Sequence, residues 1–209
     1  MGTGRDLLVR HAATGRVDHI LAGVLVNEPA ASPIQLAPPV KPLGCVRILG
    51  IDPGSQITGF GIVDLEGKRT AVVQWGSIRT SGEHSDRLRS IFRALGDIVR
   101  EYRPSEVAIE RVFLSRNADS ALKLGQARAA AMCATFAADV PIYEYSARHI
   151  KKAVVGSGGA EKEQVQRMVR MILGVREQIA ADAADALATA ICHANERGVR
   201  SALQIVAKG

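Results

Sequence analysis

The 209-residue chain has little cysteine and no long apolar run. Its cysteines, Cys45, Cys133 and Cys192, are odd in number and lack a CxxC spacing. That pattern argues against a zinc site and against a disulfide framework, and it fits a reducing cytosol. No apolar run approaches the roughly 20 residues that a membrane-spanning helix needs. The sequence therefore favours a protein of the cytosol.

Positive charge exceeds negative charge along the chain, with a formal net charge of +6 and an isoelectric point near 9.5. Such a balance favours an anionic partner such as nucleic acid, although many soluble proteins share it. The hydrophobic content of 47% is ample for a core. The length allows one sizeable domain with an appendage.

The first 45 residues differ in composition from those that follow. An isolated apolar patch at 20–26 precedes a cluster of prolines, namely Pro29, Pro33, Pro38, Pro39 and Pro42. This predicts a flexible, Pro-rich extension over 1–45, then a folded domain over 46–197 and a tail over 198–209. A signal peptide is the disfavoured alternative, because no small-residue cleavage site follows the patch. We also hypothesise that Val46 is the natural start.

Hydrophobic periodicity predicts an α/β domain from residue 47 onward. The expected strands span 47–52, 58–65, 70–78, 106–110 and 141–145, and the expected helices span 84–102, 117–138, 146–155, 160–173 and 180–195. Three meander strands followed by alternating strands and helices predict a five-stranded mixed sheet. It would combine a three-stranded antiparallel meander with two parallel strands, flanked by helices.

Four carboxylates lie at the ends of predicted strands or within a predicted helix. Asp52 and Glu110 each end a short apolar run that reads as a buried strand. Asp182 and Asp185 are spaced i, i+3 in an alanine-rich helix, so both share one face. Each acid taken alone could be a helix cap or half of a surface ion pair. Together they indicate a shared site.

Burying unpaired carboxylates is costly, and a divalent cation repays that cost. Oxygen-only ligands suit Mg²⁺, with Mn²⁺ possible. On a basic chain such a site points to phosphodiester hydrolysis by two metal ions. We expect Asp52 to bridge the ions, Glu110 to complete one site, and Asp182 with Asp185 to complete the other.

The motifs amount to a family resemblance. They are residues 48–55 (ILGIDPGS), 110–113 (ERVF), 117–128 (NADSALKLGQAR), 154–162 (VVGSGGAEK) and 181–187 (ADAADAL). In this order and spacing the chain resembles the RuvC family of bacterial Holliday-junction resolvases, over about residues 46–196. The resemblance implies a ribonuclease-H-like fold and an endonuclease that cuts four-way junction DNA in recombination and repair. It also implies catalytic roles for the four carboxylates, a cytoplasmic homodimer, and RuvA and RuvB as partners.

The resemblance extends to basic residues and to a glycine-rich turn. Lys151 and Lys162 match lysines that the family uses at the scissile region. Gly156 and Gly158 belong to a turn before a helix, where free N–H groups can bind phosphate. A plain helix-to-helix connection is the alternative for that turn. Arg148 and Lys152, with Arg167 and Arg170, are expected to line a general DNA groove.

Phe113 follows Glu110 by three positions, in a loop with Arg116 and Asn117. An aromatic residue in such a loop can wedge into a base step, although a half-buried anchor is the ordinary alternative. The family resemblance favours contact with bases near the cut. We therefore expect Phe113, Arg116 and Asn117 to bind DNA.

The helix over 117–138 carries small residues at turn spacing, namely Ala121, Gly125, Ala129 and Cys133. Such a surface allows another helix to approach closely. A four-way junction has two-fold symmetry, and a two-fold enzyme would cut it at symmetric points. We place the dimer contact on this helix, with packing against the chain's own sheet as the alternative.

Two other functions fit parts of the pattern. The DPGS loop at 52–55 also resembles the phosphate loop of actin-like ATPases and sugar kinases, but those need two duplicated domains. A non-catalytic junction-binding protein would keep the basic groove and lose at least one acid. All four acids are present, so an endonuclease is favoured over both.

Overall fold

The structure is a computed structural model that describes residues 9–10, 17–21, 24–27, 40–111 and 117–206. Its strands are β1 (Val9–Arg10), β2 (Val17–Leu21), β3 (Val24–Asn27), β4 (Val46–Asp52), β5 (Ile57–Glu66), β6 (Arg69–Arg79), β7 (Glu106–Arg111) and β8 (Ile142–Ser146). Its helices are α1 (His84–Tyr102), α2 (Ala118–Cys133), α3 (Ala147–Val155), α4 (Lys162–Leu173) and α5 (Ala181–Val206), with a 3-10 turn η1 (Phe136–Ala138).

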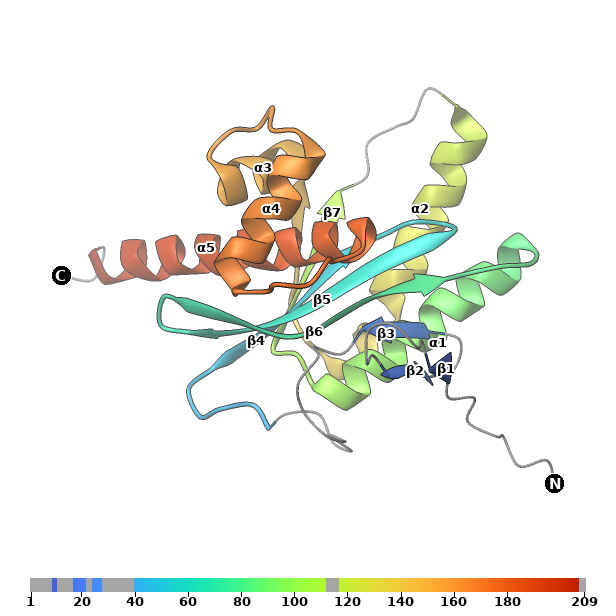
Figure 1. Cartoon of the computed structure of the whole chain (residues 1–209), viewed down its shortest axis with the longest axis horizontal. Helices are drawn as coiled ribbons and strands as arrows, with labels where there is room; N and C mark the ends of the chain where they lie inside the picture. Colours follow the sequence, from blue (N-terminus) through green and yellow to red (C-terminus); the bar gives the residue numbers. More distant parts are fainter. Residues whose placement is uncertain (1–8, 11–16, 22–23, 28–39, 112–116, 207–209) are drawn as a thin grey trace.

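The strands form one mixed sheet in the order β1-β2-β3-β6-β5-β4-β7-β8. Strands β4, β5 and β6 make the antiparallel meander, and β7 and β8 continue from β4 in parallel. The predicted five-stranded mixed sheet is thus confirmed as the run from β6 to β8. Helices α3, α4 and α5 cover one face of this sheet, while α1 and α2 cover the other (Figure 1).

The structure differs from the sequence expectations at three places. Strands β1 to β3 fall within 1–45, where no strand was predicted, and β3 pairs with β6. An edge strand such as β6 offers unpaired backbone groups, which another strand can satisfy. Helix α2 ends at Cys133, ahead of η1, and there the backbone N–H and the hydroxyl of Thr135 both donate to the carbonyl of Met132. Helix α5 continues to Val206, through much of the predicted tail, because no proline interrupts it.

The alternation of side chains along β4 and β7 divides the core into two layers. Ile48 and Ala108 belong to the core under α3, α4 and α5. Leu49, Ile51 and Ile109 belong to the core under α1 and α2. Side chains two positions apart on a strand point to the same face. The register therefore predicts that residues 52 and 110 face α5.

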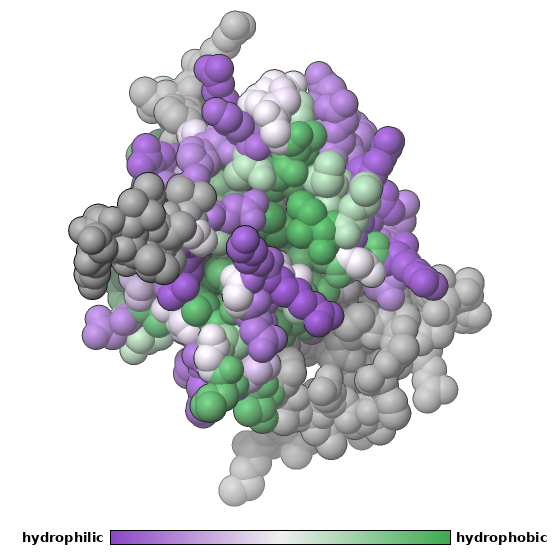
Figure 2. All heavy atoms as spheres, turned by 90° about the vertical axis from the view of Figure 1, so that its left-hand side faces the viewer, coloured by the Kyte–Doolittle hydropathy of each residue, from purple (hydrophilic) through white to green (hydrophobic). Residues whose placement is uncertain are grey.

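The described surface is mixed in character. Seen from the side on which α5 ends, hydrophilic residues surround an apolar area (Figure 2). Among the described residues, no helix combines the length and the apolar character that crossing a membrane would require.

Candidate active site

Two of the predicted acids end neighbouring parallel strands. In the register of β4 and β7, Gly50 lies beside Ala108 and Ile51 beside Ile109, so Asp52 and Glu110 come next to each other at the same sheet end. Both are half-buried. Because the side chains of residues 48, 50 and 52 share a face, Asp52 points toward α5, as Glu110 does on β7.

Helix α5 brings the other two acids to this point, and glycines allow it to come close. A Cβ atom on Gly59 would lie 2.0 Å from the carbonyl oxygen of Asp182, and one on Gly50 would lie 2.1 Å from that of Ala186. Gly59 is the cross-strand partner of Asp52. Only strands without side chains at these positions can let the helix backbone touch the sheet. The first turn of α5 is therefore fixed beside Asp52.

Two lysines complete the cluster. A cavity of about 150 Å³ is lined by residues of β7, α3, α4 and α5, including Glu110, Lys151, Lys162 and Asp185. The Nζ atom of Lys162 lies 2.8 Å from Oδ2 of Asp185. Lys162 is the first residue of α4, and its helix start is fixed by a capping box between Glu161 and Gln164.

The acids interact electrostatically through this half-buried site. Burial raises the pKa of Asp52 to about 8, and the charges of Glu110, Asp185 and Asp182 add to the shift. Burial and the charge of Asp185 likewise raise the pKa of Glu110, against the opposing pull of Lys162 and Lys151. Burial raises the pKa of Asp185 too, although its hydrogen bond with Lys162 acts in the other direction. Asp52, Glu110 and Asp185 therefore keep their protons to higher pH than ordinary carboxyl groups do.

The donor set suits a hard divalent cation. Carboxylate oxygens from three separate segments face one region, and their mutual repulsion is what a bound cation would relieve. These residues fit a divalent metal ion by the chemistry and charge of their oxygen donors, although within the described part of the chain no three His, Cys, Asp or Glu side chains are placed to hold one as they stand.

Several residues expected to contact DNA lie on or just after α3, the helix that brings Lys151 to the cavity. Arg148 and Lys152 are exposed on α3. Gly156 ends that helix with φ 86, and a Cβ atom on Gly158 would meet the side chain of Arg148 at 2.7 Å. The left-handed backbone conformation therefore favours glycine at position 156, and the contact with Arg148 favours glycine at position 158.

The residues of the loop after Glu110 are only partly described. Phe113 and Arg116 lie outside the described residues. Asn117 caps α2, with its side chain accepting a hydrogen bond from the backbone N–H of Ser120 at 3.1 Å. The structure therefore gives Asn117 a capping role, and its contact with DNA stays a prediction.

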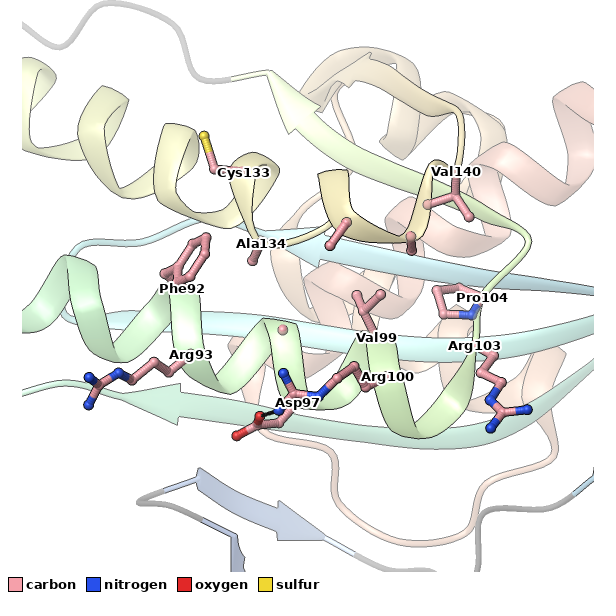
Figure 3. Close-up of a pocket in the computed structure, with 13 residues that line it drawn as sticks. Phe92, Arg93, Asp97, Val99, Arg100, Arg103, Pro104, Cys133, Ala134 and Val140 are labelled. Carbon is pink, nitrogen blue, oxygen red and sulfur yellow. Dashed lines mark hydrogen bonds and ion pairs between the residues drawn. The ribbon is translucent and has the colours of Figure 1, made fainter.

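A larger hollow of about 630 Å³ lies elsewhere, between α1 and the region after α2 (Figure 3). Phe92, Val99, Cys133 and Val140 line it together with arginines, and none of the four acids does. It belongs to the opposite face of the sheet, among elements of the other core layer. Size alone therefore does not mark the site of chemistry.

Sequence reasoning missed the glycines that seat α5. Gly50, Gly59 and Gly61 occur inside strands that are otherwise buried and apolar, and a Cβ atom on Gly61 would meet Leu187 at 2.6 Å. Glycine within a strand signals a bulge or a close approach of another backbone. That signal was present in the sequence, but it did not say which element approaches.

Fold and site together define a class. A mixed sheet of this topology, with acids at the ends of its central strands and on a crossing helix, is a ribonuclease-H-like nuclease. The chain also matches the family model described as "Crossover junction endodeoxyribonuclease RuvC" over residues 48–193. The chain therefore belongs to the RuvC family, whose members are Holliday-junction resolvases that use divalent metal ions.

Individual relatives agree. A crossover junction endodeoxyribonuclease RuvC from Shewanella sp. (strain MR-4) is 55% identical over 147 residues, which are 70% of this chain and 85% of that protein. The one from Geobacter metallireducens is 51% identical over 163 residues, 77% of this chain and 99% of that protein. The structure of Thermus thermophilus RuvC in complex with Holliday junction substrate is 34% identical, with a TM-score of 0.70, covering 74% of this chain and 96% of that one.

Proposed function

We propose that this chain hydrolyses phosphodiester bonds at the crossover of four-way junction DNA, with Asp52, Glu110, Asp182 and Asp185 holding two Mg²⁺ ions. The observation that carries the proposal is the gathering of the four acids at one half-buried point, where burial first, and then the charges of Glu110, Asp185 and Asp182, raise the pKa of Asp52 to about 8. Such mutual repulsion costs stability and is retained at functional sites. Mn²⁺ is the alternative metal, because it prefers the same ligands.

The acids would divide the metal-binding work. Asp52 lies between Glu110 on one side and the α5 acids on the other, so it is suited to bridge the ions. Two bound ions would supply activation of the attacking water and neutralisation of the charge on the leaving 3′ oxygen. Glu110 would complete one site, and Asp182 with Asp185 the other. The bond between phosphorus and the 3′ oxygen breaks as the water oxygen bonds to phosphorus.

The two lysines, Lys151 and Lys162, would stabilise the negative charge of the scissile phosphate. Lys162 and Lys151 border the same cavity as Glu110 and Asp185, which places two positive charges beside the acids. The hydrogen bond with Asp185 raises the pKa of Lys162, so that it stays charged. A positioned charge of this kind stabilises the negative charge that develops on the phosphoryl oxygens.

Surfaces beside the acids would bind the junction arms. Arg148 and Lys152 on α3 and the turn with Gly156 and Gly158 lie next to the cavity and carry exposed positive charge or backbone N–H groups. Phe113, Arg116 and Asn117 are proposed to contact bases near the cut on the ground of family membership. The complex of the Thermus thermophilus relative with Holliday junction substrate supports binding of four-way junction DNA.

We also propose a homodimer through α2. Gly125, Ala129 and Cys133 are exposed, whereas Ala127 and Ala131, on another side of the helix, are buried. The face of small residues is thus not used to pack against the chain's own sheet. Two copies joined there could cut two strands at symmetric points. RuvA and RuvB in the bacterial cytoplasm are the partners that family membership suggests.

A cleavage assay on a synthetic four-way junction tests the proposal. Wild-type protein should nick paired strands in Mg²⁺ or Mn²⁺ without ATP, and should bind without cutting in Ca²⁺. Asp52→Asn should lose cleavage by at least about 1000-fold while still binding the junction. Asp119→Asn is the matched control, because Asp119 is an exposed acid on α2 that pairs with Lys123. Cleavage by Asp52→Asn at near wild-type rate would refute the assignment.

A further inference from the structure

A chain of hydrogen bonds ties α5 to two strands, and it begins at Tyr145, the cross-strand partner of Glu110. The hydroxyl of Tyr145 lies 2.7 Å from Nδ1 of His193, and Nε2 of His193 lies 2.6 Å from Oε2 of Glu106. Nε of Arg197 donates to the other oxygen of Glu106 at 3.0 Å. Tyr145 belongs to β8, Glu106 to β7, and both His193 and Arg197 to α5.

The network is buried at its centre. The side chain of His193 has 0% exposure and that of Glu106 has 14%. The rings of Tyr143 and His193 have centroids 4.4 Å apart. Burial alone would raise the pKa of Glu106, but hydrogen bonds from His193 and Arg197 outweigh it and lower the pKa. Glu106 therefore accepts as a carboxylate, and a neutral imidazole can donate from Nε2 and accept from Tyr145.

The position of the network along the two elements matches the position of the acids. Glu106 precedes Glu110 by four residues on β7, which is roughly 13 Å along a strand. His193 follows Asp185 by eight residues on α5, which is roughly 12 Å along a helix. The helix runs against the direction of the strand, since Asp182 contacts Gly59 at the Asp52 end and Ala186 contacts Gly50 further back. Pairing His193 with Glu106 therefore sets Asp185 opposite Glu110.

We propose that His193 is a positioning residue, which through Glu106 fixes the register of α5 along β7 and so places Asp182 and Asp185 against Asp52 and Glu110. The inference rests on the proposed roles of these acids. Elsewhere α5 packs through apolar side chains, mostly alanines together with Leu187 and Ile191, and apolar contacts are non-directional. A buried hydrogen-bonded pair has one satisfied arrangement, and such pairs can specify a unique register.

The test compares His193→Leu with wild type in the full-length protein. Leucine keeps the site apolar and filled, but removes both hydrogen bonds. We expect Mn²⁺ affinity, measured by electron paramagnetic resonance titration without DNA, to fall roughly tenfold. Single-turnover cleavage should fall roughly 10- to 100-fold and recover partly at high metal concentration. Junction affinity in Ca²⁺ should change less than about twofold, because the phosphate-binding surface is untouched.

Two further variants separate positioning from general stability. Glu106→Gln keeps an oxygen that can accept from His193, and should retain metal affinity within about threefold of wild type. His149→Leu breaks the other histidine–carboxylate pair of α5, His149 with Glu196 at 2.8 Å on the surface, and should leave metal affinity unchanged. If His193→Leu does not fold, His193→Met takes its place, with the same loss expected, because methionine also lacks an N–H donor for Glu106.

A lower unfolding temperature for the His193 variant, with unchanged Mn²⁺ affinity and cleavage per folded molecule, would overturn the positioning role. A loss of metal affinity in His149→Leu as large as that in His193→Leu would overturn it as well. Failure of the proposed function itself gives a different result: Asp52→Asn would then bind metal and cut like wild type, whatever His193 does.

Discussion

Asp52 has three other carboxylates around it, and this environment affects folding as well as chemistry. In the metal-free protein its pKa is about 8, against 3.8 for an ordinary aspartate. The folded state therefore holds a proton that the unfolded state releases above about pH 4. Folding stability must fall as pH rises from about 4 to about 8, and this contribution is constant beyond that window.

Asp52→Asn should remove this loss of folding stability at high pH, because asparagine carries no ionisable proton. In EDTA at pH 8.5 we expect the variant to be more stable than wild type by about 2 kcal/mol or more, with no gain near pH 4. Urea unfolding at the two pH values measures the difference. Asp119→Asn, at an exposed site, should show no such pH-dependent gain. Equal stability of Asp52→Asn and wild type at pH 8.5 would contradict the raised pKa of Asp52.

Lys162 is expected to act on the transition state more than on binding. Lys162→Gln should reduce single-turnover cleavage by about 100-fold, because a positioned charge beside the phosphate is lost. Junction affinity should fall less than about threefold, with the salt slope lowered by about one. Lys123→Gln, which removes a lysine paired with Asp119 on α2, is the control. Losses of equal size in cleavage and binding would make Lys162 an ordinary groove residue.

Phe113 is predicted to stack on bases near the cut. Phe113→Ala should lose stacking worth about 1–3 kcal/mol per base, felt mainly when the junction distorts towards its cleavable form. Cleavage should fall well beyond any loss of binding, and a mismatch at the cut site should partly rescue the variant. A lower unfolding temperature without rescue by mismatches would show instead that Phe113 is a packing anchor.

At the scale of elements, the contact of α5 with β4 and β5 decides where two of the acids lie. Gly59→Ala would place a methyl group against the carbonyl of Asp182, and α5 must shift to accept it. We expect a loss of about 2–3 kcal/mol in stability and a clear loss of Mn²⁺ affinity in the protein that remains folded. Thermal unfolding and metal titration measure the two effects.

Gly96→Ala is the matched control for that change. Gly96 lies within α1, and a Cβ atom there meets nothing within 4 Å. In a helix the substitution should stabilise the protein by up to about 1 kcal/mol and leave metal binding unaltered. If Gly59→Ala behaved like Gly96→Ala, the close approach of α5 would not be needed to place Asp182.

At the scale of the whole molecule, the exposed face of α2 should decide the oligomeric state. Ala129→Arg would put a long charged side chain on the surface of small residues that we propose as the dimer contact. Sedimentation should then show monomers. The two strands of one junction should be cut independently of each other and no longer together. Glu66→Arg, at the exposed end of β5, should stay dimeric. A dimeric Ala129→Arg would move the contact elsewhere.

The amino-acid sequence by itself determined much of this protein. Period-two and helical patterns predicted the central five strands and the helices, and α1 has the predicted bounds. The acids could be found because each stands beside a recognisable local pattern, such as Asp52 after the apolar run of β4. These features depend on neighbours within a few residues, which is the range over which periodicity and capping act.

Only the tertiary structure decided how the elements meet. It showed that α5 touches the glycines of β4 and β5, that His193 pairs with Glu106 across 87 positions, and that the small face of α2 is exposed. It also paired β3 with β6, where the sequence predicted no strand. Each depends on residues far apart in the chain, and local propensity carries no information about which distant partner a surface will find.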